Sequence, residues 1–497
     1  MITIKFLNKE DLLSDSTINN IYNLLLVEEK IIREELKTIM DVIRDDIICF
    51  MEYPYVERIY RDSYYSFFSK KHNLCCKDSL RISFFDQSIN ETNYFTTEDL
   101  EKYFFGYISL RPTTYRIIGS SFLHPEIMKN HNFVCCLCRK TVLVNGLKLT
   151  IHGFPYCAQD NESITCSEVS ILNIMEYFGH KYPEYSTILP SQITKMLSKQ
   201  TYERQLPSVG ISLPNISYVL KKLGFGVKVY SNESKKDNTP VDPITYEDDE
   251  FRESLFIYIE SGIPVILLSE NHAILAIGRK EVSENQYKTN SLFNFSLKKA
   301  KTEKSFTDFL NHLLVMNDNN PPYELIDYNN QNSNGFKINS FIVPLYAKVN
   351  MTAYGLKESF TAALKILSTH EEIKDIQFID SNRNYIYRYF FTSSKSYKNY
   401  IAKSQDLSYE FKILALAKTM PKFIGIVEII NETNFNEVDG VVVLDATESG
   451  NYNYLLFAAN SNYLIIKSIQ KYQIFAINEK FRMYKNNLKG EHTQWKG

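Results

Sequence analysis

Cys166, His272 and Asp327 are residues whose types and order in the chain could support covalent chemistry. Acyl transfer by a cysteine requires a neutral imidazole that takes the thiol proton and a carboxylate that orients the imidazole. Each residue also has a structural interpretation. A buried free cysteine usually serves as a small apolar side chain, a histidine beside an apolar strand is more often structural than catalytic, and a buried aspartate needs a partner in any case. The elements that carry the three residues bear on this choice.

The stretch from 159 to 179 predicts a short polar loop that delivers Cys166 to the first turn of a helix. Apolar side chains then recur with helical spacing until Gly179, a residue that favours helix ends. These positions are Val169, Ile171, Leu172, Ile174, Met175 and Phe178. We expect a buried helix with only its N-terminus facing a cleft. Unpaired backbone N–H groups and the positive end of the helix dipole favour the thiolate there, and the thiolate is the nucleophile.

His272 lies in the polar break between two apolar runs of the segment 262–279. The two runs predict buried strands, with the histidine at the start of the second strand. A further short strand is predicted from 323 to 329, where Asp327 follows two apolar residues. We interpret Asp327 as the carboxylate that orients His272.

Together these segments resemble the papain-like cysteine peptidases, and most closely the bacterial peptidases similar to the double-glycine leader peptidases of bacteriocin exporters. The resemblance covers residues 149–345 and includes Gln159 upstream of Cys166, the strands around His272 and the strand ending in Asp327. It implies a central helix packed on an antiparallel sheet. It also implies that the Gln159 side chain and the backbone N–H of Cys166 stabilise an oxyanion.

Three features depart from the pattern of that family. Ser167 follows the cysteine where many relatives have glycine. Gln159 lies seven positions before the cysteine, which leaves Asp160 as an outside alternative for the oxyanion position. The interval between the histidine and the aspartate is long because a polar insertion spans 280–322. Asn329 is therefore an alternative third member, and the absence of a third member is another.

The length and segment pattern predict an α+β protein with several regions. A chain of 497 residues corresponds to about two to four domains. We expect an N-terminal α+β region at 1–148 with a long helix from 16 to 49 followed by strands, a papain-like domain at 149–345 with polar insertions near 231–250 and 280–322, and a C-terminal α/β region of unknown role at 346–497.

The composition excludes some classes of partner. Apolar residues make up 44% and charged residues 23% of the chain, which is ordinary for a globular protein. The net charge is -2, so the chain has no excess of basic residues, and we do not expect nucleic acid as a partner. No run approaches the roughly 18 apolar residues that span a membrane, and the N-terminus lacks the apolar core of a secretory signal. We expect a cytoplasmic bacterial protein that does not insert into membranes.

The eight cysteines do not show the spacing of a disulfide framework. His72 with Cys75, and Cys135 with Cys138, have a spacing that zinc ligands can adopt. The residues around Cys135 equally predict a buried strand in which cysteines act as small apolar side chains. We favour the strand, and predict no cofactor and no metal.

The predicted function is a cysteine hydrolase, most simply a peptidase that cleaves amide bonds of a protein or peptide substrate through a Cys-His-Asp triad and an acyl-enzyme. An acyltransferase or deamidase would use the same residues, because only the nucleophile that resolves the acyl-enzyme differs. A catalytically inactive papain-like scaffold that acts in binding is the third alternative.

Overall fold

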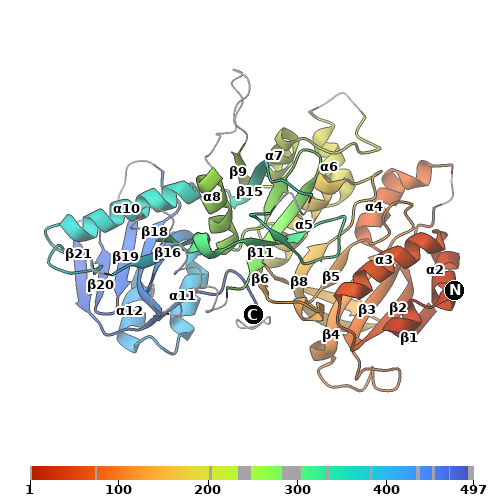
Figure 1. Cartoon of the computed structure of the whole chain (residues 1–497), viewed down its shortest axis with the longest axis horizontal. Coiled ribbons are helices and arrows are strands. Elements are labelled where there is room, and N and C mark those ends of the chain that lie inside the picture. The colour runs from red at the N-terminus through yellow and green to blue at the C-terminus, as the bar shows by residue number, and fades with distance from the viewer. Residues whose placement is uncertain are drawn as a thin grey trace.

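The computed structural model of the chain describes residues 3–72, 75–200, 204–232, 248–282, 304–330, 335–380, 383–431, 437–449, 454–468 and 471–490. Most of the first predicted insertion and half of the second lie outside these residues. The protein is a mixed α+β chain, as predicted. The described residues form three sheets, which lie side by side along its longest axis (Figure 1). The described strand pairs are antiparallel, except for one parallel pair in the third sheet.

The first sheet has seven strands in the order β1-β2-β3-β4-β5-β8-β7. Its strands are β1 (Thr3–Asn8), β2 (Ile47–Tyr55), β3 (Ser79–Asp86), β4 (Phe104–Leu110), β5 (Ser121–Leu123), β7 (Cys138–Val144) and β8 (Leu147–Tyr156). The helices of this region are α1 (Lys9–Leu12), α2 (Asp15–Leu25), α3 (Glu29–Val42) and α4 (Arg58–Ser66). α2 and α3 lie over the sheet in Figure 1, and their apolar side chains join its core.

The prediction of a single helix from 16 to 49 is wrong. The chain forms α2 and α3 and then enters β2 at Ile47. α2 ends because Leu26 adopts the left-handed conformation, with φ of 57°, and such a residue commonly ends a helix. The apolar side chains of both helices pack into one core, so the apolar spacing continues on both sides of the turn. The turn therefore cannot be recognised from the spacing.

The middle sheet has the order β14-β13-β11-β10-β15-β9, with β6 paired to β11. Its strands are β6 (Phe133–Cys135), β9 (Phe225–Ser231), β10 (Val265–Leu268), β11 (Ala273–Lys280), β13 (His312–Met316), β14 (Glu324–Asp327) and β15 (Ser340–Tyr346). Its helices are α5 (Cys166–Lys181), α6 (Pro190–Leu197), α7 (Leu213–Lys222) and α8 (Asp248–Glu260). α5 contacts β11 on one side and β7 and β8 of the first sheet on the other, so it lies between two sheets.

The third sheet has the order β12-β16-β17-β18-β19-β20-β21, with β22 paired to β18. Its strands are β12 (Lys304–Ser305), β16 (Tyr385–Ser393), β17 (Phe423–Asn431), β18 (Glu437–Asp445), β19 (Leu455–Asn460), β20 (Tyr463–Lys467), β21 (Tyr472–Ala476) and β22 (Phe481–Arg482). Figure 1 shows α10 (Ala353–Thr369) on one side of this sheet, and α11 (Ser394–Lys403) and α12 (Tyr409–Ala417) on the opposite side.

The predicted region boundaries do not coincide with the boundaries between the sheets. The boundary between 148 and 149 falls inside β8, which completes the first sheet. β6 precedes that boundary yet pairs with β11 of the middle sheet, and β12 pairs with β16 of the third sheet. One cluster of buried apolar residues extends from Leu7 to Leu488. The three regions therefore pack as one body, and residues of the first sheet can reach the surroundings of Cys166.

Candidate active site

Cys166 is the first residue of α5, and its side chain is half-buried. The turn before it is held by Glu168, whose Oε2 accepts hydrogen bonds from the backbone N–H and the hydroxyl of Thr165. Ser208 donates its hydroxyl to the other carboxylate oxygen of Glu168. A helix cannot supply acceptors for the N–H groups of its own first turn. The backbone N–H of Cys166 is therefore placed to donate to a ligand beside the thiol.

The loop before Cys166 is organised by the buried carboxylate of Asp160. Its Oδ1 accepts the backbone N–H groups of Glu162 at 2.9 Å, Ser163 at 2.6 Å and Ile164 at 3.0 Å. Its Oδ2 accepts the Ser163 hydroxyl at 2.5 Å. Both oxygens of its carboxyl group are thus used within the loop. Asp160 is thus a loop-forming residue, and the alternative that assigned it to the oxyanion position is not supported by its contacts.

His272 immediately precedes β11, as the sequence predicted, and three side chains meet at its Nε2 atom. Nε2 lies 3.0 Å from Oδ1 of Asn317, 3.2 Å from Nδ2 of Asn319 and 3.5 Å from Oδ1 of Asp318. The register explains this convergence. β11 and β13 run antiparallel with Leu275 opposite Met316, so the residues after β13 lie beside the residue before β11.

Asp327 does not orient His272, which corrects the prediction made from the sequence. It pairs with His312 at the far end of β13, about five residues or roughly 16 Å from Asn317. Its Oδ1 accepts the backbone N–H of Asn329 at 2.9 Å, and Asn329 is exposed. The error arose because β13 and β14 form a hairpin. The end of β13 lies beside His272, whereas the end of β14, which carries Asp327, lies beside the start of β13.

The Cys166 thiol interacts with the His272 imidazole and acts to raise the pKa of the histidine. Burial lowers the pKa of His272, but the interaction with Cys166 and the charge of Asp318 outweigh it and raise that pKa to about 9. A proton therefore rests readily on the imidazole beside the thiol, as an activated cysteine requires.

Asp318 is the carboxylate of this site. Its side chain is 3% exposed, and burial raises its pKa to about 6, although the charge of His272 opposes the shift. Its Oδ2 is buried without a hydrogen-bond partner among the described residues. Asn317 makes the shorter contact with His272 and also donates its Nδ2 to Glu324 at 3.1 Å. The imidazole is thus oriented by an amide oxygen and faced by a charged carboxylate.

Gln159 is buried, and its Nε2 donates to Oδ1 of Asn319 at 2.8 Å. The same Asn319 contacts His272, so one side chain joins the predicted oxyanion residue to the base. An amide nitrogen carries two N–H groups, and the bond to Asn319 uses one of them. The structure therefore brings Gln159, His272 and Cys166 into one connected group, whereas Asp327 lies outside it.

The sequence contained a signal for the residues that were missed. Asn317, Asp318 and Asn319 directly follow the apolar run of β13, in a stretch that the sequence identified only as part of the polar insertion at 280–322. Polar residues at a strand end commonly serve a site, but their proximity to His272 depends on the pairing of β11 with β13. No local pattern reveals that pairing.

The described residues contain no group of three or more histidine, cysteine or acidic side chains that could hold a metal. Cys135 lies buried in β6, and Cys138 starts β7. Burial raises the pKa of both thiols well above the usual range, which disfavours the thiolate that binds zinc. The interpretation of these cysteines as small apolar side chains is the one that their surroundings support.

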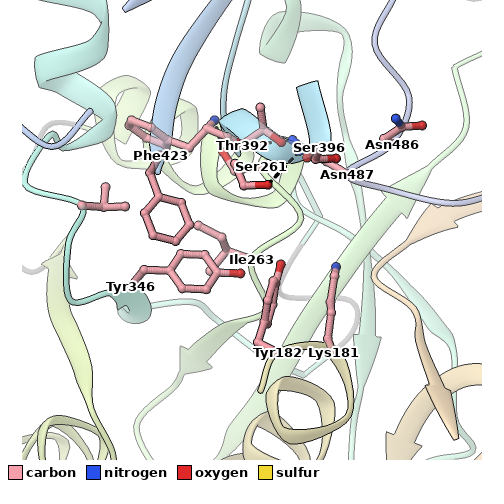
Figure 2. Close-up of a pocket in the computed structure, with 13 residues that line it drawn as sticks. Lys181, Tyr182, Ser261, Ile263, Tyr346, Thr392, Ser396, Phe423, Asn486 and Asn487 are labelled. Carbon is pink, nitrogen blue, oxygen red and sulfur yellow. Dashed lines mark hydrogen bonds between the residues drawn. The ribbon is translucent and has the colours of Figure 1, made fainter. Parts of the chain in front are cut away.

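A hollow lies at the C-terminal end of α5, beside the third sheet (Figure 2). Lys181 and Tyr182 line it together with residues of β16 and β17, and several of its polar side chains already make hydrogen bonds. The Ser261 hydroxyl accepts the Phe391 N–H at 2.8 Å, for example. The 16 residues of α5 span about 24 Å, so this hollow is separate from the Cys166 site.

Comparison with known proteins found no matching family model, curated protein or solved structure. Within the described part of the chain, no helix is both long enough and apolar enough to cross a membrane. A functional proposal for this chain therefore depends on the geometry of the site and on the resemblance seen in the sequence.

Proposed function

We propose that this protein is a papain-like cysteine hydrolase, most simply a peptidase that acts on a protein or peptide substrate. The observation that carries the proposal is that Cys166, at the start of a buried helix, interacts with His272 and helps to raise its pKa, while Nε2 of the same histidine lies 3.0 Å from Oδ1 of Asn317. The placement of α5 against an antiparallel sheet agrees with the resemblance to papain-like peptidases. Asn317 and Asp318 take the orienting role first assigned to Asp327.

In the first half of the reaction, the Cys166 thiolate attacks the carbonyl carbon of an amide bond. The new C–S bond forms as the C=O π electrons move to oxygen. The Gln159 side chain and the backbone N–H of Cys166 donate hydrogen bonds to this oxyanion. When the oxyanion collapses, the C–N bond breaks and His272 donates its proton to the departing nitrogen. An amine leaves, and a thioester remains on the enzyme.

In the second half, water resolves the thioester. His272 is now neutral and removes a proton from the water as its oxygen attacks the thioester carbon. The second oxyanion forms at the same donors, and its collapse breaks the C–S bond. The products are a carboxylic acid and the Cys166 thiolate beside a protonated His272, which is the starting state. Asn317 and Asp318 keep the imidazole oriented through both proton transfers.

The test is the rate at which iodoacetamide alkylates Cys166 from about pH 4 to about pH 9, measured by mass spectrometry. We expect rapid labelling near about pH 6 in the wild type and its loss in His272→Ala, because the imidazolium stabilises the thiolate. Cys76 is an internal reference in each spectrum, since it is also partly exposed and burial raises its pKa.

If Cys166 is labelled only as the pH approaches about 8.5, the ordinary thiol pKa, and His272→Ala changes nothing, the hydrolase proposal fails. A fold used for binding would then be the better interpretation. If labelling is rapid and depends on His272, the next step is to incubate the protein with a peptide library and identify the cleaved bonds.

A further inference from the structure

The connection between β4 and β5 of the first sheet reaches both loops of the proposed active site. Arg111 donates from Nη2 to the carbonyl of Ala158 at 2.5 Å, directly before Gln159. Arg116 donates from Nη2 to the carbonyl of Asn319 at 2.7 Å. The two loops are more than 150 residues apart in the chain, yet one short segment, which we call the brace (residues 111–118), holds both.

The contacts of Arg111 hold the loop that carries Gln159. Arg111 is 1% exposed, and its Nη1 lies 3.5 Å from the sulfur of Cys157. The backbone supports the same attachment, because the N–H of Ala158 donates to the carbonyl of Ile118 at 3.2 Å. The position of Gln159 is thus set by the first sheet as well as by its own loop.

The contacts of Arg116 hold the loop that carries Asn319. Its Nη1 forms an ion pair with Glu35 of α3 at 2.7 Å, while Nη2 holds the Asn319 carbonyl. The planar guanidinium fixes the directions of both bonds, which a flexible lysine would not do as well. The Asn319 side chain is the point at which Gln159 and His272 meet. Glu35 therefore connects to the proposed base through Arg116 and Asn319.

The brace is itself fixed. The carbonyl of Arg116 accepts hydrogen bonds from the Thr113 hydroxyl and, at 3.5 Å, from Nε of Arg111. Together with the bond between Gln159 and Asn319, these contacts close a ring that passes through the brace and both loops. A shift in any part of the ring changes the position of the oxyanion donor relative to the base.

We propose that the brace makes the first sheet an activating part of the active site, with Arg111 and Arg116 as positioning residues. This inference rests on the proposed function. Its physical reason is that base and oxyanion donors act only when held close to the productive geometry, and a displacement of about 1 Å can cost about a hundredfold in rate. The N-terminal region is then required for activity even though it supplies none of the reacting groups.

The test compares Arg116→Gln with Arg81→Gln by the rate of Cys166 alkylation across the pH range and by thermal unfolding. Arg81 is the matched control, because it also bonds a carboxylate, Glu52, and a backbone carbonyl, that of Leu143. Leu143 lies beside the turn between β7 and β8, and the ten residues of β8 span about 33 Å from that turn toward Gln159.

We expect Arg116→Gln to slow labelling near about pH 6 by at least about tenfold, because the loop that carries Asn317, Asp318 and Asn319 is then no longer fixed beside His272. Arg81→Gln should keep the wild-type pH profile, although its unfolding temperature falls at least as far. Arg116→Lys, which retains the charge but has a single donating nitrogen, should restore part of the rate. If Arg116→Gln does not fold, Glu35→Gln replaces it, and we expect a smaller slowing of the same sign.

Two outcomes overturn the brace while leaving the hydrolase proposal intact. One is rapid, His272-dependent labelling in the wild type that Arg116→Gln or its replacement retains in full. The other is an equal loss of labelling in Arg81→Gln, which would indicate general destabilisation. If the wild type itself shows no rapid labelling, the proposed function fails, and the inference about the brace fails with it.

Discussion

At the residue scale, a carboxylate and two amides surround Nε2 of His272, and two of them act on its protonated form. Asn317 accepts a hydrogen bond when Nε2 carries a proton, and Asp318 supplies the charge that favours the protonated ring. The pKa of Asp318 is about 6 and that of His272 about 9, so both groups are charged between these values. The imidazolium that stabilises a thiolate is therefore available across neutral pH.

The substitution Asp318→Asn tests this assignment. Removing the carboxylate takes away a charge that raises the pKa of His272, so this pKa should fall from about 9 and the ring should lose its proton at lower pH. The readout is the imidazole C–H resonance of His272, followed by NMR across the pH range and assigned with His272→Ala. Asp327→Asn is the control and should leave the titration unchanged. A shift in Asp327→Asn but not in Asp318→Asn would restore the assignment made from the sequence.

At the element scale, the start of α5 is the feature that gives Cys166 its position. Glu168 is buried and accepts from Thr165 and Ser208, so its carboxylate ties the first turn of the helix to the segment that precedes α7. Ser167 also donates its hydroxyl to the carbonyl of Ile211, although at a long 3.4 Å. The residue after the cysteine, which departs from the family pattern, thus contacts that same segment.

We predict that Glu168→Gln lowers the free energy of unfolding by about 1–2 kcal/mol, because a buried side chain that accepts three hydrogen bonds is altered. Denaturant unfolding measures this change. Glu29→Gln is the matched control, since Glu29 also lies in the first turn of a helix but is exposed. Its effect should stay within about 0.5 kcal/mol. Equal effects of the two substitutions would show that the Glu168 contacts do not stabilise the helix start.

At the scale of the whole molecule, a buried charge cluster joins the middle and third sheets. Glu260, at the end of α8, is fully buried between Arg279 of β11 and Arg388 of β16. Arg388 also pairs with Glu428 of β17 at 2.8 Å. Burial acts to raise the pKa of Glu260, but the two arginines outweigh it, and the pKa is lowered. Its stabilising effect is thus present at neutral pH and is lost as the pH falls below the ordinary carboxyl range.

We predict that Glu260→Gln destabilises the protein by about 3–5 kcal/mol at neutral pH, because it leaves buried arginines without a full set of counter-charges. The loss should shrink as the pH is lowered, since the wild-type carboxylate is then protonated as well. Chemical denaturation at several pH values measures both effects. Glu253→Gln, on the same helix, is the control: its pair with Lys357 is nearer the surface and should contribute about 1 kcal/mol or less.

The parts of the site that depend on local pattern could be predicted from the sequence. The helix beginning at Cys166 and the strands on either side of His272 are confirmed, because apolar periodicity and polar breaks lie within a single segment. The prediction of one long helix from 16 to 49 was wrong because it also relied on apolar periodicity alone. The apolar periodicity continues past Leu26, and no residue type near it indicated the turn between α2 and α3.

Only the tertiary structure decided which distant segments meet. Asp327 and Asp318 both lie near strand ends, and the antiparallel register of β13 with β11 and β14 selects Asp318 as the neighbour of His272. The bond from Arg116 to Asn319 joins residues 203 positions apart. Contacts of this kind follow from how sheets bury their faces and align their strands, and that depends on the whole chain. The sequence by itself determined the local elements and the residue types able to do chemistry, and the packing of the three sheets decided which of those residues form one site.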